Sequence, residues 1–198
     1  MIRKIVSNQI EENCYLIEDE NGIVIIDPGC GVHEKIAHIT QGKRDLSIII
    51  THGHADHIFD ADLINADSIY IHPMDFDHLF DEHKSLLKYF GKKTLNIERS
   101  IVKNCKLLEN RWKVFHTPGH TPGSCCYLYN ESILFSGDTV FSNSIGRCDL
   151  PGGDEKEMSK SVDFIKGFLI GNPDIKILPG HGPETNAKLI LLENPFFR

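Results

Sequence analysis

Long hydrophobic runs are absent from this 198-residue chain, and none approaches the ~18 apolar residues that a membrane-spanning helix needs. The first residues, Met1–Val6, also lack the apolar segment of a secretory signal peptide. We therefore expect a soluble, cytoplasmic protein that has no membrane as a partner.

Cys-x-x-Cys pairs are absent as well. The six cysteines occur singly or as the adjacent pair Cys125 and Cys126, which indicates reduced, mostly buried thiols. The core does not depend on disulfides, because a chain of this length can bury roughly 70% of its unfolded surface. We expect residues 1–198 to form one domain.

Positive charge is scarce, with 21 Lys and Arg against 28 Asp and Glu and a formal net charge of -7. This balance argues against a cationic track for nucleic-acid phosphates as the main binding surface. A small-molecule substrate is the expected partner, and the oligomeric state is left open.

Histidine, in contrast, is concentrated in one stretch, Thr51-His52-Gly53-His54-Ala55-Asp56-His57. It follows a short apolar run at residues 46–50, which is typical of a strand buried on both faces. In extended backbone, His52 and His54 point to the same side and can bind one cation together. A helix starting near Asp56 would direct Asp56 and His57 elsewhere, toward a second cation. Imidazole and carboxylate groups are the usual ligands of zinc. If the cluster had arisen by chance and bound no cation, the cost of burying these polar groups would be largely uncompensated.

Three later stretches carry further ligand types: His120 in Thr117–Ser124, Asp138 in Ser136–Thr139 and His181 in Pro179–Gly182. With the histidine stretch, they resemble the metal-binding motifs of the metallo-β-lactamase fold superfamily. The branch that is most similar is glyoxalase II (hydroxyacylglutathione hydrolase), in its short single-domain form. The resemblance implies an α/β fold, an αββα sandwich of two packed mixed sheets with helices on the outer faces.

The resemblance also implies two divalent metal ions, with zinc expected and iron or manganese as alternatives. One ion would take His52, His54 and His120, and the other Asp56, His57 and His181, with Asp138 bridging both. A hydroxide between the ions would attack a carbonyl carbon, and Asp56 would be the catalytic residue that orients it. A thioester suits this site because a thiolate leaving group needs little protonation. The expected function is therefore a thioesterase.

Two other functions of the same fold are the alternatives: a mononuclear iron persulfide dioxygenase, and a phosphodiesterase or nuclease. Glyoxalase II proper continues into a helical domain, whereas only 17 residues follow His181 here. From this we expect thioester hydrolysis that does not depend on glutathione. The acyl group and the thiol carrier are left open.

Several residues near the proposed site have two interpretations each. Arg147 either holds a substrate carboxylate or pairs with Asp149. Asp27, in an Asp-Pro-Gly turn, either orients a metal ligand or only forms the turn. Cys148 is interpreted as a passive residue with a reactive thiol as the alternative, and His116 is the reserve ligand.

Apolar periodicity and turn residues predict the following elements. The expected strands are residues 2–6, 13–18, 23–26, 46–50, 68–72, 100–108, 112–117, 124–129, 132–135 and 175–178. The expected helices span about 32–41, stopped by Gly42, and 155–170, with a last one opened by Pro183. Asn21-Gly22 is a hairpin signal. Residues 74–99 indicate two short helices that form either a lid or a solvated hairpin.

Overall fold

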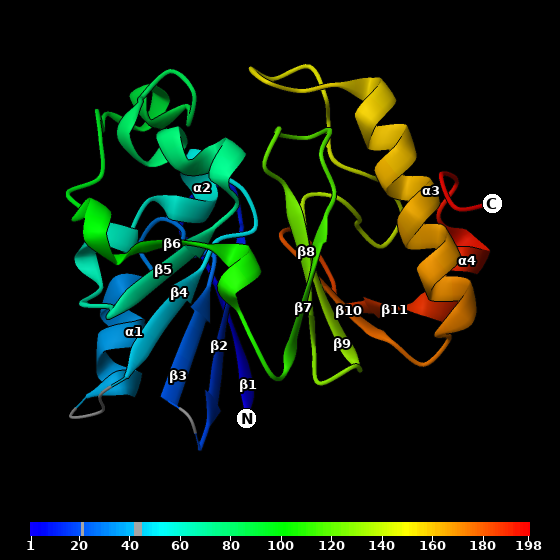
Figure 1. The fold of residues 1–198 in the computed structure, drawn as a ribbon, viewed down its shortest axis with the longest axis horizontal. Helices are drawn as coiled ribbons and strands as arrows, with labels where there is room; N and C mark the ends of the chain where they lie inside the picture. The colour runs from blue at the N-terminus through cyan, green and yellow to red at the C-terminus, as the bar shows by residue number, and fades with distance from the viewer. Residues whose placement is uncertain (21, 42–44) are drawn as a thin grey trace. The chain divides into compact units, whose positions relative to one another are not determined.

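The computed structural model describes residues 1–20, 22–41 and 45–198 (Figure 1). The chain divides into two compact units, Met1–Leu107 and Leu108–Arg198. Each unit contains one β-sheet with its own hydrophobic core. The single domain expected for residues 1–198 stays a prediction.

The first unit is built on a six-stranded sheet whose spatial order follows the chain (Figure 1). Its strands are β1 (Ile2–Val6), β2 (Asn13–Asp19), β3 (Gly22–Ile26), β4 (Leu46–Ile49), β5 (Ser68–Ile71) and β6 (Val102–Asn104). The β1–β2 and β2–β3 pairs are antiparallel, and the remaining pairs are parallel. Parallel strands need crossover connections, and helix α1 (His33–Thr40) lies in the one between β3 and β4.

The core of this unit explains the apolar residues of β4. Ile48 in β4 and Ile25 in β3 are fully buried, and Val32 and Ile36 of the α1 region belong to the same cluster. A parallel strand inside a sheet has both faces covered, which explains why the consecutive residues Ile48 and Ile49 are both apolar and buried. After β4 the chain runs through a loop into the short helix α2 (Ala55–Ile58).

The second unit is built on a five-stranded mixed sheet in the order β11-β10-β9-β8-β7. Its strands are β7 (Trp112–His116), β8 (Cys125–Tyr129), β9 (Ile133–Gly137), β10 (Lys176–Pro179) and β11 (Thr185–Asn186). Only the β9–β10 pair is parallel among these strands. Its crossover contains α3 (Glu155–Gly171), and α4 (Ala187–Glu193) follows β11.

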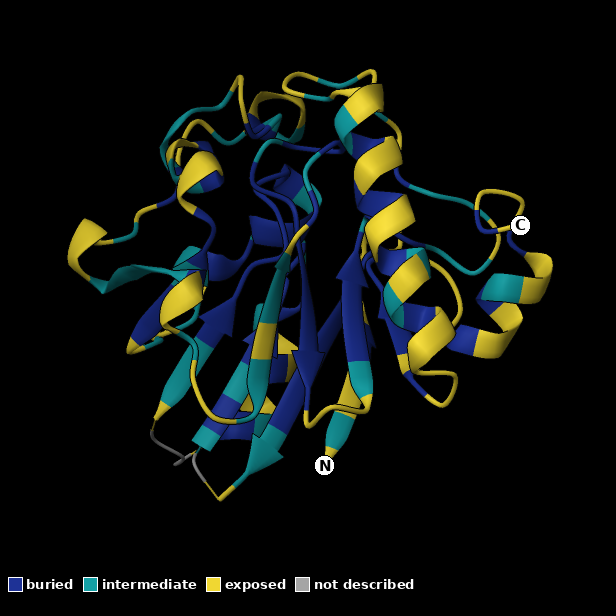
Figure 2. Cartoon of the chain, turned by 45° about the vertical axis from the view of Figure 1, so that its right-hand side comes forward, coloured by how far each residue is buried: buried dark blue, intermediate teal, exposed yellow. Residues whose placement is uncertain are grey.

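Helix α3 begins and ends where the sequence predicts. Asp154 caps it by accepting hydrogen bonds from the backbone N–H groups of Lys156 and Glu157, at 2.8 and 3.0 Å. Met158, Ile165 and Leu169 are buried in the core of the second unit. Figure 2 shows exposed residues along one side of this helix and buried ones along the other. Such one-sided burial is what the apolar spacing of the sequence predicts.

Two predicted elements are wrong in their extent. The strand expected at 100–108 is only the three-residue β6, because 3₁₀ turns occupy residues 99–101 and 105–107 on both sides of it. The last helix begins at Ala187 rather than at Pro183, because Thr185 and Asn186 first pair with β10. The Asn186 side chain then caps the helix by accepting from the N–H of Leu189 at 3.0 Å.

The two short helices expected within 74–99 are 3₁₀ segments, Pro73–Phe80 and Leu87–Phe90. Asn21 of the hairpin signal and the helix stop Gly42 lie outside the described residues. Within the part of the chain that the structure describes, no helix is long and apolar enough to cross a membrane.

Candidate metal centre

The first unit brings four predicted ligands together at the carboxyl end of β4. His54 has extended backbone, with φ -76° and ψ 151°, as the sequence predicts for this stretch. The ring centroid of His52 lies 4.9 Å from that of His54 and 4.1 Å from that of His57. The Nε2 atom of His57 lies 3.7 Å from Oδ2 of Asp56. All three imidazoles are at most 3% exposed, so this is a buried cluster of nitrogen and oxygen donors.

Asp27 holds this cluster from the end of β3. Its Oδ2 atom lies 2.9 Å from Nδ1 of His57 and accepts a 2.6 Å hydrogen bond from the Thr51 hydroxyl. Its Oδ1 atom accepts the backbone N–H of Thr51 at 2.7 Å. These contacts favour the interpretation in which Asp27 orients a ligand. With Nδ1 engaged in this way, a metal ion would be bound by Nε2 of His57.

The second unit brings the other three predicted ligands together around one carboxylate oxygen. The Nε2 atoms of His120 and His181 each lie 3.6 Å from Oδ2 of Asp138. His120 lies in the loop after β7, while Asp138 and His181 follow the neighbouring parallel strands β9 and β10. Because the carboxyl ends of parallel strands meet at one edge of a sheet, the fold explains the proximity of Asp138 and His181.

The Ser144–Asp149 loop supports His120 through its backbone. The ring N–H at Nδ1 of His120 donates to the carbonyl oxygen of Arg147 over 2.7 Å. A Cβ atom on Gly146 would overlap the carbonyl oxygen of Asp138, so this close approach requires glycine. The sequence drew attention to the Arg147 side chain, whereas the contact with the ligand is made by its main chain.

The Arg147 side chain is paired with Asp149. Its Nε and Nη2 atoms donate to the two carboxylate oxygens at 2.6 and 2.7 Å. The hydrogen bond from Arg147 lowers the pKa of Asp149 to about 2. Both side chains are exposed, at 64% and 66%. Contact with a substrate carboxylate stays a prediction for Arg147.

The reserve candidates contact other groups. His116 is exposed, and its Nε2 atom lies 2.9 Å from the Pro122 carbonyl oxygen. Burial, followed by the nearby Glu155, Asp149 and Asp154, raises the pKa of the half-buried Cys148 thiol. Since the thiolate is the reactive form, a raised pKa favours the passive interpretation of Cys148.

Residues 74–99 contact the loop that carries the first four predicted ligands, residues 51–57, which we call the histidine loop. The Oδ2 atom of Asp75 accepts the N–H of Gly53 at 2.8 Å, and the carbonyl oxygen of Ser85 accepts the N–H of Ala55 at 2.7 Å. Residues 74–99 are thus not a solvated hairpin, because they form hydrogen bonds with the loop that carries the predicted ligands. A lid function stays a prediction. Sequence reasoning missed Asp75 because its carboxylate is 22 positions away from Gly53.

The donor chemistry of both clusters fits divalent metal ions. Two ligand atoms bound at 2.0–2.1 Å to one tetrahedral ion lie ~3.4 Å apart, close to the 3.6 Å between each imidazole Nε2 and Asp138 Oδ2. Ligating histidines commonly donate their other ring nitrogen to a carboxylate or carbonyl, as His57 and His120 do here.

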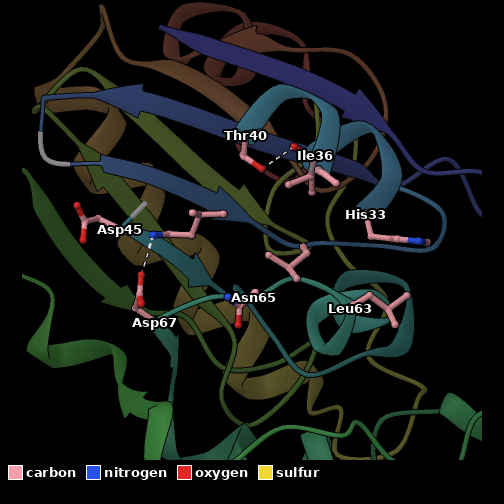
Figure 3. A pocket seen from close by; sticks show the side chains of 10 residues that line it. His33, Ile36, Thr40, Asp45, Leu63, Asn65 and Asp67 are labelled. Carbon is pink, nitrogen blue, oxygen red and sulfur yellow. Dashed lines mark hydrogen bonds between the residues drawn. The ribbon is translucent and has the colours of Figure 1, made fainter. Parts of the chain in front are cut away.

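A separate cavity of about 670 Å³ lies in the first unit beside α1 (Figure 3). Its lining includes His33, Thr40, Asp45, Leu63 and Asp67. None of the predicted metal ligands lines it, so we do not assign it to the candidate centre.

Comparison with known proteins places this chain in a family. Residues 9–181 match the family model of the metallo-β-lactamase superfamily. A protein of Aquifex aeolicus is 36% identical over 208 residues, covering 99% of this chain and 96% of that protein. The probable metallo-hydrolase YqgX of Bacillus subtilis is 30% identical, covering 98% and 96%.

Solved structures give the same result. The B3 metallo-β-lactamase BLEG-1 is 31% identical and superposes with a TM-score of 0.83, covering 100% of this chain and 99% of that one. TTHA1623, crystallised in a di-iron-bound form, is 32% identical with a TM-score of 0.81, covering 98% and 99%. These similarities confirm the expected α/β fold class, while the glyoxalase II branch stays a prediction. The chain belongs to the metallo-β-lactamase superfamily.

Proposed function

We propose that this protein is a metal-dependent hydrolase that cleaves small-molecule thioesters. The observation that carries the proposal is the convergence of the Nε2 atoms of His120 and His181 on one oxygen of Asp138, at 3.6 Å each. Two imidazole nitrogens and a carboxylate oxygen at this spacing are a usual set of ligands for a divalent ion. The related YqgX is named a probable metallo-hydrolase, and PksB of Bacillus subtilis, 29% identical, a probable zinc-dependent hydrolase.

The proposed centre uses the complete predicted ligand set. His52, His54 and His120 would hold one divalent ion, Asp56, His57 and His181 the other, and Asp138 both. Zinc is the first candidate, with iron and manganese as the alternatives. When bound, such a pair of ions supplies an activated water at neutral pH and polarises the carbonyl oxygen of the substrate.

The residues of the chain then have separate tasks. Asp56 is 18% exposed, so its carboxylate can orient a water molecule and accept its proton. Asp27 keeps the His57 ring in one orientation through the 2.9 Å contact with Nδ1. A thioester suits this arrangement because the departing thiolate needs no dedicated general acid.

The test combines metal analysis with a substrate panel. The reconstituted protein is expected to take up two equivalents of metal and to hydrolyse thioesters, including the lactoyl thioesters of glutathione and of a small thiol. Asp138→Ala is expected to lower kcat/KM by at least ~100-fold, because a shared carboxylate positions both ions. The control His116→Ala changes an exposed histidine only four residues from His120 and is expected to leave kcat/KM within ~3-fold.

Specific outcomes would contradict this proposal. A plateau at one metal equivalent would contradict the dinuclear centre, and so would equal losses in the folded Asp138→Ala and His116→Ala variants. The panel also contains a chromogenic cephalosporin, because BLEG-1 is a metallo-β-lactamase with 31% identity over the whole chain. Cephalosporin turnover without thioester turnover would replace thioesterase by β-lactamase as the function.

A further inference from the structure

The histidine loop is bound along its backbone by the segment that follows β5. The carboxylate of Asp75 is fully buried, and its Oδ2 atom accepts the N–H of Gly53 over 2.8 Å. Gly53 lies between the predicted ligands His52 and His54. The hydrogen bond therefore holds the peptide group that joins His52 to Gly53, one of the two peptide groups between the Cα atoms of His52 and His54.

Two further contacts join the same segment to the same loop. A Cβ atom on Gly53 would overlap Cβ of His78, so the loop and the 3₁₀ segment Pro73–Phe80 touch at this point. The N–H of Ala55 donates to the carbonyl oxygen of Ser85 at 2.7 Å. The backbone is thus tied on both sides of His54.

A carboxylate is an expensive group to bury, and its presence here needs a reason. Burying a charge without hydrogen bonds costs more than burying an apolar side chain of the same size. Asp75 is held in place by its own backbone N–H, which donates to the His72 carbonyl oxygen at 3.0 Å. The charge-assisted bond to Gly53 is stronger than a neutral one would be. Stronger anchoring of the ligand loop is what the buried charge provides.

We propose that Asp75 is a positioning residue, which sets the loop so that the Nε2 atoms of His52 and His54 are ready to receive one metal ion. This inference rests on the proposed function, because it requires these histidines to bind metal. Preorganised ligands bind more tightly, since the loop does not have to be ordered when the ion arrives. Asp75 contacts neither substrate nor metal in this proposal and acts through Gly53, while its other oxygen, Oδ1, lies 3.9 Å from Nδ1 of His78.

The test measures metal affinity by competition with a chromophoric zinc chelator. Asp75→Ala removes the acceptor and is expected to weaken zinc binding 10–100-fold, the usual effect of removing a group that orients a ligand. Asp75→Asn keeps a carbonyl acceptor in the same place but loses the charge, so its zinc affinity is expected to lie between those of the wild type and Asp75→Ala.

Asp62→Ala is the matched control. Asp62 also ties residues 74–99 to the first unit, since its carboxylate accepts from Nζ of Lys92 at 2.6 Å and from the N–H of Asn96 at 3.0 Å. The N–H groups of Gly53 and Ala55 donate to Asp75 and Ser85 and not to Asp62. Its loss is expected to lower stability but to leave zinc affinity unchanged. In the metal-free protein, hydrogen exchange of the Gly53 amide is expected to speed up in Asp75→Ala and not in Asp62→Ala.

The proposal is overturned if folded Asp75→Ala binds zinc as the wild type does, or if Asp62→Ala weakens binding equally. Should Asp75→Ala fail to fold, Asp75→Glu serves instead, because it keeps the charge and displaces the acceptor by one methylene. Wild-type zinc affinity of the Glu variant would then overturn the proposal. If the wild-type chain takes up no metal, the proposed function is overturned as well. If the wild type takes up metal and the zinc affinity of the Asp75 variant is unchanged, only this inference is overturned.

Discussion

The ring nitrogens of the predicted ligands serve two different purposes. Nδ1 of His57 contacts Asp27, Nδ1 of His120 contacts the Arg147 carbonyl, and Nδ1 of His52 lies 3.1 Å from the Thr51 hydroxyl. These partners favour the tautomer with a proton on Nδ1, which leaves the lone pair of Nε2 for a metal. An anionic partner also makes the imidazole a stronger donor to the ion.

The chain offers two comparable Asp–His pairs for testing this role. Asp27→Asn is expected to weaken zinc affinity 10–100-fold, because His57 loses its anionic partner. Asp60→Asn is the control, since Asp60 is equally buried and lies 2.9 Å from Nδ1 of His33, which is not a predicted ligand. The Asp60 variant is expected to lose stability and keep its zinc affinity. Equal affinity losses in the two variants, measured by chelator competition, would speak against an orienting role for Asp27.

At the scale of elements, the predicted ligands lie in or next to loops that follow strand ends, while helices pack against the sheets. Helix α3 is the longest described helix, and its buried side chains Met158, Ile165 and Leu169 form much of the core of the second unit. The loop that holds His120 is joined to it, since Ser161 donates to the Pro118 carbonyl oxygen at 2.7 Å. Stability of α3 and order of the His120 loop are therefore linked.

The cap of α3 gives a prediction about stability. Asp154→Ala removes the acceptor for the N–H groups of Lys156 and Glu157 and is expected to cost about 1 kcal/mol of unfolding free energy. Asp163→Ala, an exposed change within the same helix, is expected to stay within about 0.5 kcal/mol of the wild type. Urea denaturation of both variants measures the difference. Equal stability of the two would mean that the cap contributes nothing.

At the scale of the whole molecule, the predicted ligands divide between two compact units, with four in Met1–Leu107 and three in Leu108–Arg198. Each unit orders its own set with its own sheet. If ions bind the native protein and not the unfolded chain, their binding free energy adds to the stability of folding.

Metal removal is therefore expected to destabilise the protein. Zinc at 100 times its Kd should add about 2.7 kcal/mol to the free energy of unfolding, and a chelator should remove that gain. Asp138→Ala is expected to abolish most of this zinc-dependent shift, whereas the exposed Asp149→Ala is expected to retain it. Thermal unfolding with and without zinc measures the shift. No zinc effect on the wild-type Tm would contradict metal binding by the folded state.

The sequence by itself determined the chemical types and the order of the predicted ligands. Four of them, His52, His54, Asp56 and His57, lie within six positions, so their pattern can be recognised without the fold. It also determined most strands and helix α3, since apolar periodicity and capping residues are local properties. It failed at residues 99–107, where short 3₁₀ turns leave room for only three strand residues.

Only the tertiary structure decided what holds the ligands in place. The partners of His57, Gly53 and His120 lie 30, 22 and 27 positions away, and each is a common residue type in an ordinary loop or turn. The Arg147 contact uses a main-chain carbonyl, which every residue has, so no sequence pattern can point to it. Such contacts exist because parallel strands deliver their carboxyl ends to one edge of a sheet, and that arrangement is a property of the fold rather than of any short stretch.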